Sequence, residues 1–285
     1  MVDHKKLSFL IVLFLFSINL IVWQVVFSLN EQDSLEITFF DIGQGDSIFI
    51  ETPYKSQILI DGGPNSTILE KLVEEMPFWD KTIDLIILTH PEADHMSGLL
   101  NVLESYNVKR ILWTGIIRDT AQYKKWREMI EKENAEIIIA HSSQKIKIGD
   151  VSLNILYPLE SLEGKEFKDS NNTSIVCRLS FKNNSFLFTG DATKVSENKI
   201  IAETDCDSDV LKVGHHGSKT STSREFLENV SPDIAVISCG RDNPYKHPHE
   251  QVLKNLEELG INILRTDQDG DIKIVSNGNY LIINN

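Results

Sequence analysis

The sequence predicts a mixed α/β (α+β) fold of four layers, αββα, in which two β-sheets pack face to face with helices outside, after one N-terminal transmembrane helix. Two observations predict it. A β-rich block followed by alternating strands and helices occurs twice, with no Pro-, Gly- or Ser-rich linker between the halves. A charge-free run of 23 residues stands apart at the N-terminus. We therefore expect a cytoplasmic tip and anchor over residues 1–30 and one large domain over residues 31–285.

The composition is that of a folded domain with an acidic surface. Of 285 residues, 41% are hydrophobic and 25% are charged, and 28 Lys and Arg against 42 Asp and Glu give a formal net charge of −14. These proportions exclude a disordered or collagen-like chain. The acidic balance counts against a nucleic-acid-binding module more than against a nuclease, because metal ions can supply local positive charge. The three cysteines lack the spacing of a structural zinc site, so we expect inert packing residues.

The N-terminal run, residues 7–29, is long enough to cross a bilayer core of roughly 30 Å as a helix. Lys5 and Lys6 precede it, while Glu31 and Asp33 follow it. The positive-inside bias then predicts a single-pass protein of the cell membrane with its domain on the extracytoplasmic side. A cleaved signal peptide, which would leave a secreted protein, is the alternative. The length of the run and the absence of a small-residue cleavage pair favour the anchor.

The first half of the domain opens with three β-rich runs separated by Gly and Pro, as in a meander. Continuous apolar runs then alternate with segments that place apolar residues on one helical face. The expected strands are Leu35–Asp41, Ser47–Glu51, Gln57–Asp61, Asp84–Thr89, Arg110–Trp113 and Glu136–Ala140. The expected helices are Ile68–Glu75, a second beginning over Leu99–Glu104, and Asp119–Glu133. The GQGD segment between the first two strands is interpreted as a hairpin turn.

The second half repeats this order, with a β-rich block before mixed units. The expected strands are Lys145–Ile148, Val151–Tyr157, Ser174–Phe181, Ser185–Thr189, Val210–Val213, Ile234–Ser238, Ile263–Arg265 and Ile272–Val275. The expected helices are one that opens at Thr193, Ser223–Asn229 and Glu250–Leu259.

Histidines gather in short motifs at predicted strand ends, and this clustering is the main functional signal. The motif THPEADH carries His90, Glu92, Asp94 and His95 within six residues. Four donors on one turn suit two metal ions. The alternative is that Asp94 caps the following helix and the histidines are solvated.

Three further motifs follow strands of the second half. Asp191 lies in FLFTGDA, LKVGHHGS delivers His215 and His216 beside a permissive glycine, and NPYKHPHE places His247 at another strand end. A lone TGD is a weak signal, because Asp is common at helix N-caps. Together, an aspartate and several histidines from different strand ends fit a dinuclear site, since one carboxylate can bridge two cations roughly 3.5–4 Å apart.

In order, the motifs FFDIGQGDS, LIDGG, THPEADHMSGL, NNTSIV, FLFTGDA, LKVGHHGSKTS, NPYKHPHEQVL and RTDQDGDI resemble the metallo-β-lactamase superfamily. The resemblance is specifically to the soluble metallo-β-lactamase domain of the DNA-internalisation competence protein ComEC and its stand-alone relatives, and it covers about residues 35–274. It implies the αββα metallo-β-lactamase sandwich and a metal-dependent hydrolase with two divalent ions.

The resemblance also assigns ligands. In the superfamily's HxHxDH signature, His90 matches the first His, Asp94 and His95 match the final pair, and Asp191 matches the bridging aspartate of a later motif. Glu92 stands where the second His would be.

One further histidine is missing, because the stretch around Asn172 and Ser174 offers only amide and hydroxyl groups. With Glu92 also in place of a His, the site is expected to be rich in oxygen ligands, which favours Mn²⁺ over Zn²⁺.

Roles for the remaining residues are expectations of the same kind. His215 is expected as a later metal ligand, with His216 supporting a ligand or transferring a proton, and His247 as the competing ligand. Asp61 would orient a ligand histidine. Asn172, Ser174 and Ser218 are expected to support the site or contact substrate.

The function favoured by these observations is phosphodiester hydrolysis, by a phosphodiesterase or nuclease that acts on DNA or another phosphodiester at the outer membrane face. A water activated by two metal ions would attack, with Asp94 orienting it and His216 or His247 protonating the leaving oxygen. The alternatives are a hydrolase of a lactone, β-lactam or other ester on the same site, and a degenerate, non-catalytic binding domain. Beyond the phosphodiester substrate and the membrane, the sequence gives no evidence for a protein partner.

Overall fold

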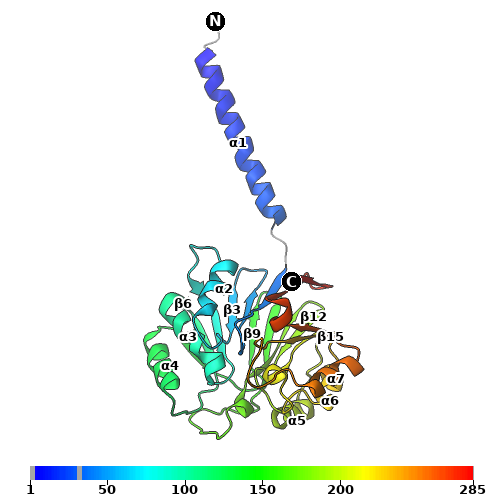
Figure 1. Ribbon diagram of the computed structural model, residues 1–285. Helices are drawn as coiled ribbons and strands as arrows, with labels where there is room; N and C mark the ends of the chain where they lie inside the picture. Colours follow the sequence, from blue (N-terminus) through cyan, green and yellow to red (C-terminus); the bar gives the residue numbers. More distant parts are fainter. Residues whose placement is uncertain (1–3, 31–33, 285) are drawn as a thin grey trace.

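Two mixed β-sheets packed face to face form the centre of the domain in the computed structural model, which describes residues 4–30 and 34–284 (Figure 1). The strands of the first sheet are β1 (Leu35–Phe39), β2 (Ile48–Glu51), β3 (Gln57–Ile60), β5 (Leu85–Leu88), β7 (Arg110–Trp113), β8 (Glu136–Ile139), β16 (Ile272–Ser276) and β17 (Leu281–Asn284). Those of the second are β9 (Lys145–Ile148), β10 (Val151–Tyr157), β11 (Val176–Phe181), β12 (Asn184–Phe188), β13 (Val210–Lys212), β14 (Ile234–Ile237) and β15 (Asn262–Arg265).

The strand orders are β17-β16-β1-β2-β3-β5-β7-β8 and β15-β14-β13-β12-β11-β10-β9. A separate pair, β4 (Thr82–Ile83) and β6 (Asn107–Val108), lies beside the first sheet.

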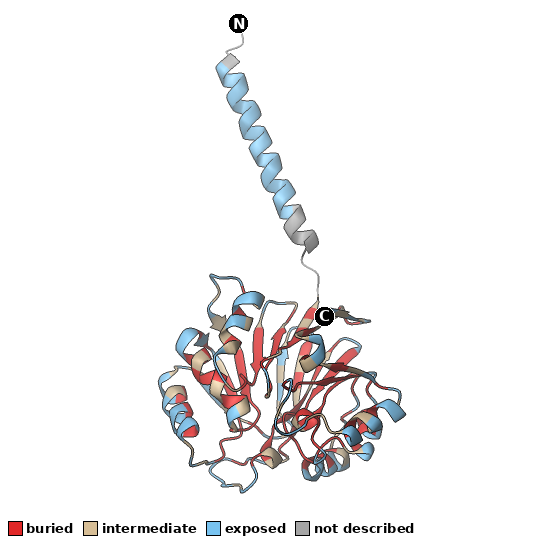
Figure 2. Ribbon diagram, viewed as in Figure 1, coloured by how far each residue is buried: buried red, intermediate tan, exposed pale blue. Residues whose placement is uncertain are grey.

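Helices cover the outer face of each sheet. They are α2 (Thr67–Glu75), α3 (Ala93–Ser105) and α4 (Ala121–Lys132) on the first sheet, and α5 (Lys194–Glu203), α6 (Arg224–Val230) and α7 (Glu250–Glu258) on the second. Three short segments, α8 (Thr266–Asp269) and the 3₁₀ turns η1 (Asn171–Thr173) and η2 (Gly214–Gly217), complete the domain. Figure 2 shows the resulting pattern, with buried strands inside and exposed outer helix faces. The predicted four-layer fold is confirmed.

The apolar runs of the central strands follow from this layering. In β3, Ile58 and Ile60 face the core between the sheets, whereas Leu59 faces the helices. In β5, Leu85 and Ile87 face inward in the same way. Because both faces of these strands are covered, the alternating pattern of a half-exposed strand is replaced by a continuous run of Leu and Ile.

Most predicted elements occur within two residues of their expected bounds. The structure adds β17 and the β4–β6 pair, the helix expected to open at Thr193 is α5, and α3 begins at Ala93, one turn and a half before the expected start. The sequence of α5 has few apolar residues, and its buried face includes Ser196 and Glu197, so it lacks the apolar periodicity of an amphipathic helix.

Helix α1 (His4–Asn30) extends away from the end of the domain at which β1 begins (Figure 1). Its stretch Lys5–Gln24 is long and apolar enough to cross a membrane, and its described side chains are exposed. Membrane anchors and signal sequences share these features. The division into residues 1–30 and 31–285 stays a prediction.

Strand direction determines where the loops meet. β1 and β3 run in the same direction, because each is antiparallel to β2, and β5 is parallel to β3. In the second sheet, β12, β13, β14 and β15 are mutually parallel. The carboxyl ends of these strands lie at the edge of the sandwich opposite the start of β1, and every histidine motif follows one of them.

Candidate metal centre

The carboxylate of Asp191, in the loop after β12, lies at the centre of a group of imidazoles. Its Oδ1 is 3.3 Å from His95 Nε2 and 3.6 Å from His216 Nε2. Its Oδ2 is 3.6 Å from His215 Nε2 and 3.9 Å from His90 Nε2. Three separate motifs of the sequence therefore meet at one side chain.

The loop after β13 reaches this position through an unusual backbone. His215 and His216 have φ values of 49° and 54°, in the left-handed region that non-glycine residues seldom adopt. This sharp turn directs two consecutive imidazoles toward Asp191. Such conformations cost about 1–3 kcal/mol each and persist where the surrounding structure enforces them, often at functional sites.

Several donor atoms in this group are buried and lack a hydrogen-bond partner among the described residues. They are His90 Nε2, His95 Nε2, His216 Nε2 and Asp191 Oδ1. Buried polar atoms are almost always paired, so four unpaired atoms that converge on one point indicate a bound group. Imidazole nitrogens and carboxylate oxygens are the donors that divalent metal ions use.

The possible ligands form overlapping sets in which all donor atoms lie within 4.8 Å of one another. Each set contains a histidine and at least one aspartate. They are His90, His95 and Asp191; Asp94, His95 and His216; Asp46, Asp61 and His95; and Asp46, Asp191 and His216. Because His95, His216 and Asp191 each belong to more than one set, the residues fit two neighbouring divalent ions.

The far side of each imidazole is fixed by a hydrogen bond, as ligand histidines usually require. His95 Nδ1 lies 2.8 Å from Asp61 Oδ2, which also accepts from the Thr89 hydroxyl at 2.6 Å. His216 Nδ1 donates to the carbonyl oxygen of Ser238 at 2.9 Å. These bonds leave the Nε2 atoms free for a ligand. Asp61 thus lies where an orienting residue was expected.

Charge is distributed unevenly among the histidines. Burial lowers the pKa of His90 to about 3. Burial also opposes the charged forms of His95 and His216, but nearby carboxylates outweigh it. These are Asp191 and Asp61 for His95, and Asp191 and Asp46 for His216. The pKa of His95 is raised well above 6.5, and that of His216 to about 10. Two imidazolium charges therefore stand beside the carboxylates, and a divalent cation would take their place with release of protons.

Two buried residues of this region were missed by the sequence reasoning. Asp46, at the end of the GQGD loop, forms a 2.6 Å ion pair with Lys212, whose side chain is fully buried in β13. Asp46 Oδ1 also lies 3.2 Å from His216 Nδ1. The segment is a hairpin loop, as expected, but it also carries a carboxylate into the site. A charged residue directly before a buried strand was the available signal.

Close approach of this loop depends on Gly45. A Cβ atom at this position would lie 2.3 Å from the carbonyl oxygen of Asp94, and the φ of 141° is unfavourable for other residues. Glycine thus lets the loop that carries Asp46 lie directly against the first turn of α3.

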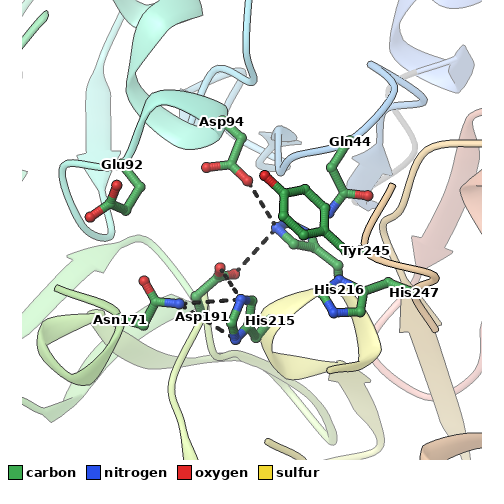
Figure 3. Close-up of a pocket in the computed structure, with 9 residues that line it drawn as sticks. All are labelled: Gln44, Glu92, Asp94, Asn171, Asp191, His215, His216, Tyr245 and His247. Carbon is green, nitrogen blue, oxygen red and sulfur yellow. Dashed lines mark hydrogen bonds and ion pairs between the residues drawn. The ribbon is translucent and has the colours of Figure 1, made fainter. Parts of the chain in front are cut away.

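Glu92 is not brought to the metal-ligating sets. Its Oε1 pairs with Arg118 Nη2 at 2.7 Å and accepts a short hydrogen bond from Ser170. The side chain still lines the cavity, but its carboxylate is directed away from Asp191 (Figure 3). Without Glu92, the donor set is a mixture of nitrogen and oxygen, and the oxygen excess expected to favour Mn²⁺ over Zn²⁺ is reduced.

The remaining predicted residues lie at the rim or behind it. His215 and His247 line the cavity without entering any of the sets, with ring centroids 5.6 Å apart. Ser174 Oγ accepts from the Asp191 amide at 3.1 Å. Asn172 accepts a short hydrogen bond from Thr193, and Ser218 Oγ lies 2.9 Å from Thr220 Oγ1, so both support loops beside the cavity.

The cavity has a volume of about 170 Å³ and is mostly polar (Figure 3). Its lining is Gln44, Glu92, Asp94, Asn171, Asp191, His215, His216, Tyr245 and His247. Asn171, which was not singled out as a site residue, places its Nδ2 3.2 Å from His215 Nε2. Asp94 Oδ2 lies 3.5 Å from His216 Nε2. Burial alone would raise the pKa of Asp94, but His216 and His95 hold it below its ordinary value.

Comparison with protein families gives one match. The family model of the metallo-beta-lactamase superfamily matches residues 40–241, which include the motifs that carry His90, His95, Asp191, His215 and His216 but not the later motif with Tyr245 and His247 or the motif RTDQDGDI.

Three curated proteins are similar over most of the chain. ComE operon protein 3 of Bacillus subtilis is 34% identical over 256 residues, 84% of this chain and 32% of that protein. Recombination protein 2 of Haemophilus influenzae is 30% identical over 96% of this chain and 32% of that protein. Competence protein ComA of Neisseria gonorrhoeae is 30% identical over 85% of this chain and 32% of that protein. The chain spans about a third of the length of these relatives.

Solved structures share the fold at low sequence identity. The metallo-beta-lactamase fold protein YhfI from Bacillus subtilis has a TM-score of 0.57 at 12% identity, covering 88% of this chain and 100% of that one. CmlA, a diiron β-hydroxylase from Streptomyces venezuelae, has a TM-score of 0.52 at 15% identity, covering 80% of this chain and 52% of that one.

Proposed function

Because this chain belongs to the metallo-β-lactamase superfamily and is a ComEC-like member of it, we propose that it is a metal-dependent phosphodiesterase that cleaves DNA while anchored to a membrane. The observation that carries the proposal is the convergence of unpaired imidazole nitrogens on Asp191. A buried group of this kind supports metal-dependent hydrolysis.

We assign two positions for divalent ions. The first ion would be held by His90, His95 and Asp191. The second would be held by Asp94 and His216, together with Asp191 and His95, which the two positions would share. Bound there, the ions would supply Lewis acidity toward a phosphoryl oxygen and a more acidic water. His216 is assigned as a ligand in place of His215, because its Nε2 lies within 3.6 Å of both Asp94 and Asp191.

His215 is assigned to proton transfer. Its side chain is about a quarter exposed and borders the cavity, while Asn171 and Thr220 contact its ring. Burial lowers the pKa of His215 below its ordinary value, so the ring is neutral at neutral pH and suited to accept a proton from an attacking water. Asp94 borders the same space and is suited to orient that water.

A nucleic acid is favoured over a small ester by the rim of the cavity. Tyr245 lies on this rim and is 62% exposed, with its ring stacked on His247 at 5.7 Å. An exposed aromatic ring beside a phosphodiester-cleaving centre can stack a nucleobase, which contributes about 1–3 kcal/mol per base. The names of the relatives, which refer to competence and recombination, point to the same substrate.

Anchoring through α1 is the second part of the proposal. The apolar stretch Lys5–Gln24 supports a membrane span, and the positive residues before it support an extracytoplasmic domain. The enzyme would then act on DNA outside the cytoplasm.

The test uses the full chain in detergent, loaded with Mn²⁺ or Zn²⁺, assayed on labelled DNA and on bis-p-nitrophenyl phosphate. Asp94→Ala should lose turnover of both substrates, whereas Asp150→Ala, in an exposed turn between β9 and β10, should keep it. Tyr245→Ala should raise the KM for DNA and leave turnover of the small diester unchanged.

Other outcomes would replace the proposal. Cleavage of only the small diester would exclude DNA, and turnover of lactones or β-lactams alone would exclude phosphodiesters. A chain that binds no metal and cleaves nothing would be a non-catalytic binding domain.

A further inference from the structure

The loop between α2 and β4 presents two adjacent aromatic side chains to solvent. Phe78 and Trp79 are 82% and 73% exposed, more than any other large hydrophobic residue in the described part of the chain. Their rings meet edge to face with centroids 4.8 Å apart, so they form one apolar projection. Folded domains seldom leave such a projection in water unless it contacts something.

Sheet register places this loop at the end of the domain where β1 begins. Glu36, the second residue of β1, pairs with Glu51, and Glu51 pairs with Gln57 on β3. The side-chain amide of Gln57 donates to Asp80 at 2.9 Å, directly after Trp79. Figure 1 shows the segment after α2 at the end of the domain from which the chain continues to α1.

The start of β1 cannot be far from the end of α1. Only four residues of the sequence separate Asn30 from Leu35, and five extended steps of about 3.4 Å span at most about 17 Å. This step rests on the anchoring proposed above: if α1 spans a bilayer, the end of the domain that carries Phe78 and Trp79 lies next to the bilayer surface.

Two more exposed aromatic residues lie at the same end. Tyr54 occupies the turn that joins β2 and β3, and Tyr280 occupies the turn that joins β16 and β17, beside Ser276, which pairs with Leu35. Tyr and Trp are enriched where proteins meet the bilayer interface, because one end of the ring is apolar and the other polar.

Among the described residues around these side chains, basic and acidic groups alternate and no basic patch forms. Lys55, next to Tyr54, pairs with Glu51 at 2.7 Å, and Asp80 follows Trp79 directly. Attraction to anionic lipid therefore contributes little at this end, and the aromatic rings must carry any contact with a membrane.

We propose that this end of the domain docks on the bilayer surface, with Phe78 and Trp79 inserted among the lipid headgroups as a second attachment beside α1. The contact needs no anionic lipid. It restricts the domain to one orientation, with the carboxyl ends of the central strands turned away from the membrane.

The test measures the depth of Trp79 in the full chain. A Trp23→Phe chain, reconstituted in phosphatidylcholine vesicles, keeps Trp79 and two indoles that are buried in the domain, at Trp113 and Trp126. The same chain with Trp79→Phe gives the signal of the buried pair. Lipid brominated close to the headgroup should quench the difference signal, and aqueous iodide should not.

A matched control moves the indole to the other end of the domain. Val195 is an exposed residue in the first turn of α5, next to the loop of Asp191. Val195→Trp, in the chain with Trp23→Phe and Trp79→Phe, should give an indole that responds to iodide and not to brominated lipid.

Each other outcome overturns the proposal. Quenching of Trp79 by iodide alone would leave the loop in water. Protection from both quenchers would place a protein surface, such as a second copy, over the pair. Loss of the chain from the vesicles on alkaline extraction would refute the anchoring itself, which distinguishes that failure from a failure of docking.

Discussion

Replacing Lys212 with methionine removes the only ammonium group paired with Asp46 among the described residues and nearly keeps the side-chain volume. Both partners are almost fully buried, and their charged atoms are 2.6 Å apart. Removing one partner of a buried pair costs about 3–5 kcal/mol, and the imidazolium of His216, 3.2 Å from Asp46, leaves only part of the carboxylate charge without a partner in this case. At about 2–4 °C per kcal/mol for a domain of this size, the Tm should fall by about 6–20 °C.

The assay is thermal and urea unfolding of the full chain in detergent with a metal chelator present, followed by circular dichroism. Lys55→Met is the control, because Lys55 makes a 2.7 Å pair with Glu51 that is exposed to solvent. A surface pair contributes about 0–1 kcal/mol, so this variant should change little. The double variant Lys212→Met and Asp46→Leu should recover most of the loss.

Equal, small effects of Lys212→Met and Lys55→Met would refute the reasoning. They would show that Asp46 is protonated or reached by water when Lys212 is absent, and that the buried pair does not hold a charge beside His216.

Three further predictions follow from the site. Glu92→Gln should leave metal stoichiometry unchanged because its carboxylate pairs elsewhere, whereas Asp94→Asn should lower it; loss of one ion in both variants, measured by elemental analysis, would contradict the geometry. Gly98→Ala should abolish metal binding and lower the Tm sharply, because the new Cβ would lie 1.8 Å from the carbonyl oxygen of Gly62 and push α3 outward; an unchanged melting curve would contradict this packing. The pKa of His216 is about 10 in the metal-free fold against an ordinary 6.5, so its protonation stabilises the fold fully below pH 6.5, and this stabilisation is lost as pH rises toward 10. The free energy of unfolding in urea should therefore be lower at pH 9.5 than at pH 7, and His216→Asn should make this difference smaller.

The fold was predictable because burial on both faces of a strand leaves a clear sequence signal. The continuous apolar runs in β5 and in β3, where Ile58 and Ile60 face one core and Leu59 the other, indicate that both faces of these strands are buried. The start of helix α5 was predicted at Thr193 from the cap that follows Asp191, but its extent was not, because its packing uses Ser196 and Glu197, with the carboxylate accepting backbone amides of the next loop. A helix stabilised by buried polar contacts has no apolar period to detect.

The site was predictable as a set of motifs but not in its internal assignment. The motifs gave His90, Asp94, His95 and Asp191, since each lies at a strand end of the same edge. They did not reveal that Arg118 would take the carboxylate of Glu92, because that contact depends on how two distant loops meet.

Which histidine of the His215–His216 pair lies closer to the other metal-ligating side chains could not be predicted from the sequence either. His215 and His216 are adjacent in sequence, and their different positions arise from two left-handed backbone conformations in succession. Asp46 and Lys212 form a long-range pair across the two sheets, and nothing local in either motif specifies the other.

The length and direction of β1 set the distance between the end of the domain next to α1 and the candidate metal centre. The strand begins at Leu35, beside the tether, and ends before the loop that carries Asp46, and its five residues measure about 17 Å at roughly 3.4 Å each. If the proposed docking end lies on the bilayer, the bond to be cleaved must lie at least this distance from the bilayer surface. A headgroup of the supporting membrane is out of reach, whereas a strand of a polymer or a free diester approaching from the aqueous side is not. The distance of the site from the membrane would then restrict the substrates as much as the chemistry of the cavity does.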